Sequence, residues 1–217
     1  MFDERYYPIK TEEGIMELPS VTTILRVANK EGLNIWRAKA GWELSEQISE
    51  ETAEIGKQIH SYVAGFIKGI AISQLEWNTL SEEIKNGIRA YERFRLQVKF
   101  EGMETEKMVY SVKYKFAGTL DAIGKIGKDK ILIDFKTGER FYPSMFAQIV
   151  AYHQAWKENN PEQRVNERVK ELFIVNLSRN TGVPNIHSLR LKRIKPYWDY
   201  FKACLNLFNC AKQIELL

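Results

Sequence analysis

The chain has 217 residues, of which 44% are hydrophobic and 28% are charged, and its formal net charge is +4. This composition is typical of a globular protein that buries a sizeable core, and it excludes a chain that is mainly disordered. The apolar runs are short and residues 1–10 are polar and charged, so the sequence predicts neither a membrane span nor a signal peptide. The mild positive charge permits a nucleic-acid partner without requiring one.

The N-terminal part, residues 1–100, is predicted to be mainly helical. Apolar residues recur there at helical spacing in two runs, which are Ile55, Ile59, Val63, Phe66 and Ile67, and then Ile84, Ile88, Tyr91, Phe94 and Val98. Two helices are therefore expected to lead into the centre of the chain.

The period changes after residue 105, and a sheet is predicted over 105–192. Three strand-like runs, at 106–112, 115–126 and 130–136, indicate an antiparallel meander, because the last two are joined by the turn-prone Gly127-Lys128-Asp129. A helix is expected over 143–159, since Pro143 suits a first helical turn and Asn159-Asn160-Pro161 would end it.

Two more strand-like runs, at 172–177 and 186–191, precede a closing helix over 195–217 whose inward face carries Trp198, Phe201, Leu205 and Phe208. The element order predicts an α/β fold with a mixed sheet and helices on both faces. No repeat, low-complexity segment or linker divides the chain, so residues 1–217 are expected to form one domain.

Two strands of the predicted meander, FAGTLDAIG at 116–124 and ILIDFKTG at 131–138, each carry a carboxylate. Asp121 and Asp134 are therefore expected to be neighbours, and Lys136 should share one face with Asp134 because strand side chains alternate. Two carboxylates after a fully apolar run need a compensating partner, and a divalent ion such as Mg²⁺ or Mn²⁺ suits their oxygens. Lys136 could then orient or help deprotonate a water that hydrolyses a phosphodiester.

Structural explanations stand beside this hypothesis. An isolated Asp-x-Lys triplet is more often a plain salt bridge at a strand end. Gln148 and Tyr152 lie four residues apart on one helix face near that strand end, but they could equally be a surface amide and a core aromatic. His60 is a candidate metal ligand or phosphate contact, although a lone helical histidine is usually structural.

Together these segments resemble the RecB-like branch of the PD-(D/E)xK nucleases, in which a helical G-xxx-H is followed by G-x-x-D, D-x-K and Q-xxx-Y. Here the motifs read GKQIH, GTLD, DFK and QIVAY, in the same order over most of the chain. The segment LPSVTTIL at 18–25, followed by LNIWRAKAGWE, also resembles the opening of phage exonucleases and of the mitochondrial genome maintenance exonuclease group.

The resemblance implies a restriction-endonuclease-like three-layer core and a metal-dependent DNA exonuclease of recombination, repair or phage DNA processing. It implies that Asp121, Asp134 and the backbone carbonyl of Phe135 bind the Mg²⁺ or Mn²⁺ ion. It further implies that His60 completes the metal site and that Lys136 assists the attacking water.

The resemblance also suggests roles for three other side chains. Gln148 and Tyr152 would support Lys136 or the substrate phosphate. Glu106, in TEKMVYS, matches an acidic position on the family's first strand and would act through a water, although a surface glutamate explains it equally well. Thr119-Leu120-Asp121 stands where the superfamily has proline-aspartate, and the cysteines of its iron-sulfur members are absent, so no cluster is expected.

Two other functions stay open. An endonuclease specific for a structure or an end could use the same residues, because the fold does not set the cleavage mode. A non-catalytic DNA-binding module could keep the fold, although Asp121, Asp134 and Lys136 together argue against it. The expected partner is DNA, with no membrane and, since no Walker A pattern occurs, no nucleotide cofactor. A homo-oligomer and a helicase or recombination partner also stay open.

The cysteines and two tryptophans give weaker expectations. Cys204 and Cys210 are too few for a zinc or iron-sulfur site and are expected to be buried free thiols in a reducing cytoplasm. Trp36 and Trp42 are expected to pack in the core, although they could instead stack on single-stranded bases.

Overall fold

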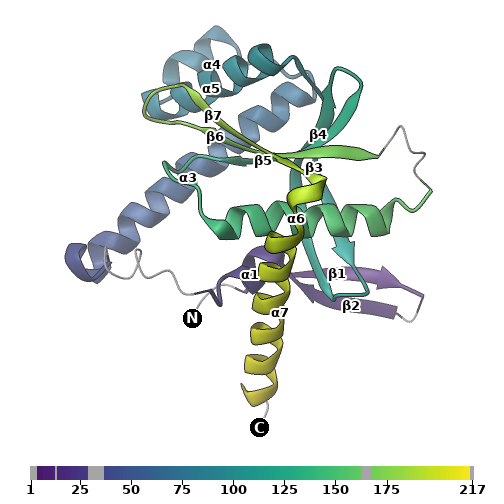
Figure 1. Ribbon diagram of the computed structural model, residues 1–217. Helices are drawn as coiled ribbons and strands as arrows, with labels where there is room; N and C mark the ends of the chain where they lie inside the picture. The colour runs from purple at the N-terminus through teal and green to yellow at the C-terminus, as the bar shows by residue number, and fades with distance from the viewer. Residues whose placement is uncertain (1–3, 13, 29–36, 163–167, 216–217) are drawn as a thin grey trace.

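The structure is a computed structural model that describes residues 4–12, 14–28, 37–162 and 168–215. Its helices and strands have these bounds: β1 Tyr6–Thr11, β2 Gly14–Pro19, α1 Val21–Leu25, α3 Trp42–Ile67, α4 Gln74–Thr79, α5 Glu82–Val98, β3 Phe100–Ser111, β4 Phe116–Ile126, β5 Asp129–Lys136, α6 Pro143–Asn159, β6 Val169–Leu177, β7 Pro184–Arg190, the 3-10 turn η2 Leu191–Arg193 and α7 Lys195–Glu215. The central sheet has the strand order β3-β4-β5-β6-β7 (Figure 1). Neighbouring strands are antiparallel except β5 and β6, which are parallel, so the sheet is mixed.

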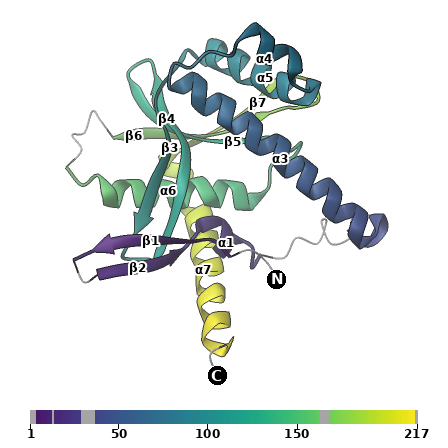
Figure 2. The same ribbon diagram turned by 180° about the vertical axis from the view of Figure 1, so that it is seen from behind.

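Different helices cover the two faces of this sheet (Figures 1 and 2). Apolar side chains of α1, α6 and α7 pack on one face, and those of α3 and α5 pack on the other. Helix α6 makes the crossover between the parallel strands β5 and β6, which no short turn could join. The predicted α/β fold, with a mixed central sheet flanked by helices, is confirmed.

Strand β5 is buried on both of its faces. Leu132 packs into the core on the α6 side, whereas Ile131 and Ile133 pack into the core on the α3 side. The uninterrupted apolar run predicted a strand covered on both faces, and this is confirmed. The turn before the strand contains Gly127 with a φ of +59°, a conformation that glycine adopts without a steric penalty.

The prediction that residues 1–100 are mainly helical is wrong for residues 6–19, which form an antiparallel hairpin of β1 and β2. Ile9 and Leu18 of the hairpin are buried against Ala117 of β4, and Ser20 forms a parallel bridge to the same residue. The hairpin buries only a few apolar side chains on a strand that is distant in sequence. The sequence of the hairpin therefore has no regular spacing of apolar residues from which its two strands could be predicted.

Helix α7 runs past the neighbouring elements and ends away from the sheet (Figure 1). Phe201, Leu205 and Phe208 are buried, as predicted. Cys204 is a buried free thiol, but Cys210 is exposed, so the prediction that both thiols are buried is wrong for Cys210. Cys210 lies six residues after Cys204, which places it on a different face of the helix from the buried Cys204, Leu205 and Phe208. Within the described ranges, no helix combines the length and apolar character needed to cross a bilayer.

The predicted core position of Trp42 is wrong, because its side chain at the start of α3 is 63% exposed. The guanidinium of Arg37 lies 5.3 Å from its ring centroid, which is a cation–π distance. Trp36 lies outside the described residues.

Candidate active site

The candidate site lies where β4 and β5 separate. The last backbone pair between the two strands at this end joins Ala122 to Ile133. Beyond it, Asp121 Oδ2 accepts a hydrogen bond from the backbone N–H of Phe135 at 2.7 Å, and the carbonyl of Asp121 accepts one from the Thr105 hydroxyl at 2.8 Å. The carboxylate of Asp121 thus takes the place of a backbone carbonyl as the acceptor for the N–H of Phe135. This hydrogen bond fixes the carboxylate beside the end of β5.

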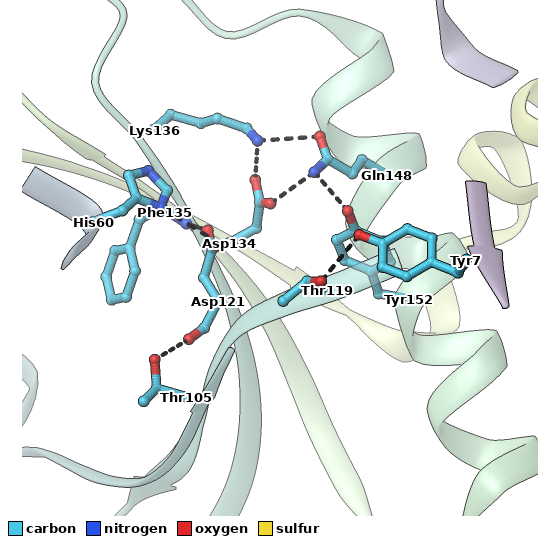
Figure 3. Close-up of polar contacts among 10 residues, drawn as sticks. All are labelled: Tyr7, His60, Thr105, Thr119, Asp121, Asp134, Phe135, Lys136, Gln148 and Tyr152. Carbon is cyan, nitrogen blue, oxygen red and sulfur yellow. Dashed lines mark hydrogen bonds and ion pairs between the residues drawn. The ribbon is translucent and has the colours of Figure 1, made fainter. Parts of the chain in front are cut away.

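A chain of polar contacts joins the end of β5 to helix α6 (Figure 3). Lys136 Nζ lies 2.7 Å from Asp134 Oδ2 and donates to Gln148 Oε1 at 3.1 Å. The Nε2 group of Gln148 donates to Asp134 Oδ1 and to the Tyr152 hydroxyl, each at 3.1 Å. The amide of Gln148 therefore connects the acid, the base and the phenol, because Gln148 and Tyr152 lie one turn apart on α6.

Helix α3 brings His60 to the other carboxylate. His60 Nδ1 lies 3.6 Å from Asp121 Oδ1, which is an ion-pair distance when the imidazole is protonated. The ring of Phe135 points toward α3 and α5, where it meets the rings of Tyr91 and Phe94 edge-on. Phe135 is therefore a core residue by its side chain, and only its backbone faces the polar contacts.

The two carboxylates differ in acidity. Burial raises the pKa of Asp134 to about 6, with Lys136 opposing the rise and Asp121 adding to it. Burial also acts to raise the pKa of Asp121, but the charges of His60 and Lys136 outweigh it and hold that pKa below its ordinary value. Burial acts to lower the pKa of His60, whereas the nearby Asp121 raises it above its ordinary value. Asp134, 1% exposed, is therefore the carboxylate whose charge lacks sufficient compensation.

A cleft of about 910 Å³ contains these side chains and opens between α3, β1 and the strand ends. His60, Glu106, Asp121, Asp134, Phe135, Lys136, Gln148 and Tyr152, all the residues that the sequence singles out for the site, line it. Hydroxyl, phenol and basic side chains from distant parts of the chain complete the lining, among them Arg5, Tyr7, Thr22, Ser49, Thr52 and Lys57. Hydrogen-bond donors thus surround the carboxylates.

Glu106 reaches the cleft, but its carboxylate is engaged by a different partner. Lys68 Nζ donates to Glu106 Oε2 at 2.8 Å. The backbone of Glu106 is left-handed, with a φ of +54°, and it lies opposite Asp121 between the pairs that Thr105 and Lys107 make with β4. A left-handed glutamate is uncommon, so β3 is strained at the point where it faces the candidate carboxylate.

The N-terminal hairpin contributes Tyr7, which the sequence offers as an aromatic that could stack on single-stranded bases but does not place at this site. The Tyr7 and Thr119 hydroxyls are hydrogen-bonded at 3.0 Å, and the guanidinium of Arg5 lies 4.7 Å from the centroid of the Tyr7 ring. Figure 3 shows the Tyr7 hydroxyl bonded to Thr119, and Tyr7 lines the same cleft as Tyr152, so the hairpin forms part of the candidate site. No local pattern could have revealed this contact, because its partners lie 112 residues apart.

Glycines allow two close approaches at the site. A Cβ on Gly118 would lie 2.4 Å from Cε1 of Tyr152, and one on Gly56 would lie 3.0 Å from Oγ1 of Thr137. The first distance is shorter than atoms tolerate, so the Tyr152 ring rests directly on the backbone of β4. The motif glycine of GTLD therefore has a packing role that its spacing alone does not indicate.

Gly118→Ala is expected to destabilise the fold by about 1–3 kcal/mol, because the buried Tyr152 ring must move and overpacking forces such shifts. Chemical denaturation measures the loss of stability. Gly138→Ala is the matched control, since a Cβ there meets nothing within 4 Å and its φ is not in the left-handed region. A Gly118→Ala variant as stable as this control would show that the Tyr152 ring is not fixed against β4.

The donor set suits a hard divalent cation that keeps part of its water shell. Asp134 Oδ2 is buried and lacks an aligned hydrogen bond, and a second carboxylate, that of Asp121, lines the same cleft. Among the described residues, no three His, Cys, Asp or Glu side chains form a ready-made metal cage. Mg²⁺ commonly binds through one or two carboxylates plus waters and substrate phosphates, so the residues fit such an ion.

Comparisons with known proteins give little beyond this geometry. No family model matches the sequence, and no curated protein matches it significantly. Among solved structures, the chain is similar to a protein from Eubacterium rectale described as a "putative exonuclease", with 13% sequence identity and a TM-score of 0.46. The match covers 69% of this chain and 64% of the other chain, so it spans less than two thirds of that protein. A likeness at this level carries no argument about function.

Proposed function

We propose that this chain is a Mg²⁺- or Mn²⁺-dependent DNA exonuclease that hydrolyses phosphodiester bonds. One observation carries the proposal, namely that Asp121, Asp134 and Lys136 meet in one open cleft where β4 and β5 separate. A salt bridge that served stability alone would not need a second carboxylate beside the buried Asp134, since a like charge raises the cost of its burial.

The acidic residues would hold the cation. Asp121 and Asp134 supply carboxylate oxygens, and the carbonyl of Phe135 and the imidazole of His60 are further candidate ligands. When bound, the cation would polarise the scissile phosphate and lower the pKa of a water molecule. Without a bound cation, His60 stabilises the charged form of Asp121, so this carboxylate is already ionised when a cation binds.

Lys136 would orient the attacking water and stabilise charge on the phosphate. Its ammonium is held at the end of β5 by Gln148, and Gln148 is held in turn by Tyr152. A fixed ammonium raises the rate more than a mobile one, because a preorganised donor needs no reorientation during the reaction. Gln148 and Tyr152 thus act on Lys136 or on the substrate phosphate.

DNA fits the remaining lining of the cleft. Arg, Lys, Ser and Thr side chains are the usual donors to phosphate oxygens, and Arg5, Lys57, Ser49 and Thr52 are of these types. The exonuclease mode rests on the N-terminal resemblance at 18–25, whereas an endonuclease could use the same carboxylates. A role in recombination, repair or phage DNA processing, and a cytoplasmic location, belong to the same proposal.

The test is the degradation of end-labelled linear single- and double-stranded DNA, with a covalently closed circle as control, in Mg²⁺, Mn²⁺ or EDTA. We expect the linear substrates to shorten only with metal and the circle to persist. Cutting of the circle would replace the exonuclease by an endonuclease. Binding of DNA without cleavage under any metal would favour the non-catalytic module instead.

A further inference from the structure

Two buried side-chain acceptors lack an aligned hydrogen bond in the described part of the chain, and one lies on the strand of Lys136 while the other lies on the strand paired with it. They are Asp134 Oδ2 and Asn176 Oδ1, and the other two buried side-chain atoms without a hydrogen bond, Trp156 Nε1 and Arg179 Nε, are donors. Buried polar groups in native proteins are nearly always paired, so an exception beside a candidate site calls for an explanation.

Asn176 lies next to Lys136 across the parallel pair of β5 and β6. The register pairs Lys136 with Asn176, one step beyond the pair of Phe135 and Val175. Partners in a parallel register point to the same face, and the strands are about 4.8 Å apart. Asn176 is 4% exposed, so its carboxamide is enclosed beside the lysine rather than hydrated.

The neighbouring Asp134 already has contacts at both of its carboxylate oxygens. Gln148 donates to its Oδ1 at 3.1 Å, and Lys136 Nζ lies 2.7 Å from its Oδ2 without the alignment of a hydrogen bond. A cation that binds Asp134 would repel the ammonium from Oδ2. Lys136 would keep its bond to Gln148 and would need one further acceptor, since an ammonium has three donors.

We infer that Asn176 is a positioning residue whose carboxamide oxygen accepts a hydrogen bond from Lys136 when Asp134 binds a divalent cation. This inference rests on the proposed function. The unpaired amide oxygen of Asn176 then gives the ammonium of Lys136 a second acceptor. The ammonium moves from Asp134 toward Asn176 and stays beside the scissile phosphate. Without this acceptor, the displaced ammonium would turn toward water and would no longer be oriented toward the substrate phosphate.

A purely structural role for Asn176 predicts the same stability without metal but no effect on activity or on the response to the cation. Leucine has nearly the shape of asparagine, and replacing a buried unpaired amide by an apolar group removes a desolvation penalty. Asn176→Leu should then be as stable as the wild type or more stable without metal, under either reading. Only the positioning role predicts that such a variant loses activity and responds less to the cation.

The experiment measures the thermal midpoint with EDTA and with Mn²⁺ for wild type, Asn176→Leu, Lys136→Met and the double variant. We expect Mn²⁺ to raise the midpoint of Asn176→Leu by less than half the wild-type shift. In the Lys136→Met background, Asn176→Leu should not change the shift, because the two residues act through one bond. The kcat for DNA cleavage by Asn176→Leu should fall about tenfold with little change in KM, as expected when a supporting partner is lost.

Asn159→Leu is the matched control, because Asn159 bonds both backbone groups of Tyr110 away from the cleft. It should lower the midpoint and leave the Mn²⁺ shift unchanged. If Asn176→Leu does not fold, Asn176→Ala takes its place with the same expectation. A Mn²⁺ shift and kcat equal to those of wild type would overturn the inference. A wild type that neither binds Mn²⁺ nor cleaves DNA would instead overturn the proposed function, so the two failures are distinct.

Discussion

Replacing Lys136 with alanine is expected to reduce the rate of DNA cleavage by about 10²–10⁴-fold, the usual contribution of a positioned acid or base. The ammonium lies 2.7 Å from Asp134 and is held by Gln148, so its loss removes a charge that is aimed at the cleft. DNA binding should persist, since the other basic and hydroxyl side chains of the cleft remain. Single-turnover cleavage of end-labelled linear DNA, beside a filter-binding measurement, separates the two effects.

This variant must be shown to fold, because it removes the partner of a buried carboxylate. Breaking such a pair is usually strongly destabilising, and Asp134 would respond by taking up a proton. Circular dichroism and the thermal midpoint report the fold. Lys128→Ala, at the exposed turn between β4 and β5, is the matched control and should behave as wild type. A folded Lys136→Ala protein that cleaves DNA within tenfold of the control would exclude a catalytic role for Lys136.

The sequence predicted the centre of the molecule because its signals are local. The apolar run at 131–133 indicated a buried strand, and the two-residue spacing of Asp134 and Lys136 placed both on one face. The four-residue spacing of Gln148 and Tyr152 likewise placed both on one side of a helix. The structure brings these four side chains into one hydrogen-bonded group.

Contacts between segments that are distant in sequence could not be predicted from such local spacing. Tyr7 reaches Thr119 through a hairpin whose position depends on a bridge to β4, and Asn176 meets Lys136 only because β5 and β6 pair in one register. The register of a parallel pair is set by packing across the whole sheet, which no short window of sequence contains.

Replacing Asp134 with asparagine is expected to abolish measurable cleavage and yet to stabilise the metal-free protein. Cleavage should fall by at least about 10²-fold, because a metal-binding and charge-stabilising group is removed. Burial raises the folded-state pKa of Asp134 to about 6 from an ordinary value of 3.8, so the ionised side chain destabilises the fold. Removing the charge should increase the free energy of unfolding in EDTA at about pH 8 by about 1–2 kcal/mol, which is a few degrees in the thermal midpoint.

The pH dependence follows from the same shift. A carboxyl group with a raised folded-state pKa binds its proton more tightly in the folded state, so its penalty is complete above about pH 6 and fades as the pH falls toward 3.8. The advantage of Asp134→Asn in EDTA should therefore shrink between about pH 8 and about pH 5. Mg²⁺ should reverse the order at about pH 8, because only the wild type gains a cation that compensates its charge. If the wild type were the more stable protein in EDTA throughout this range, Lys136 and Gln148 would fully compensate the carboxylate. Asp134 would then be one half of a structural ion pair, and the main physical reason for a cation at this site would be lost.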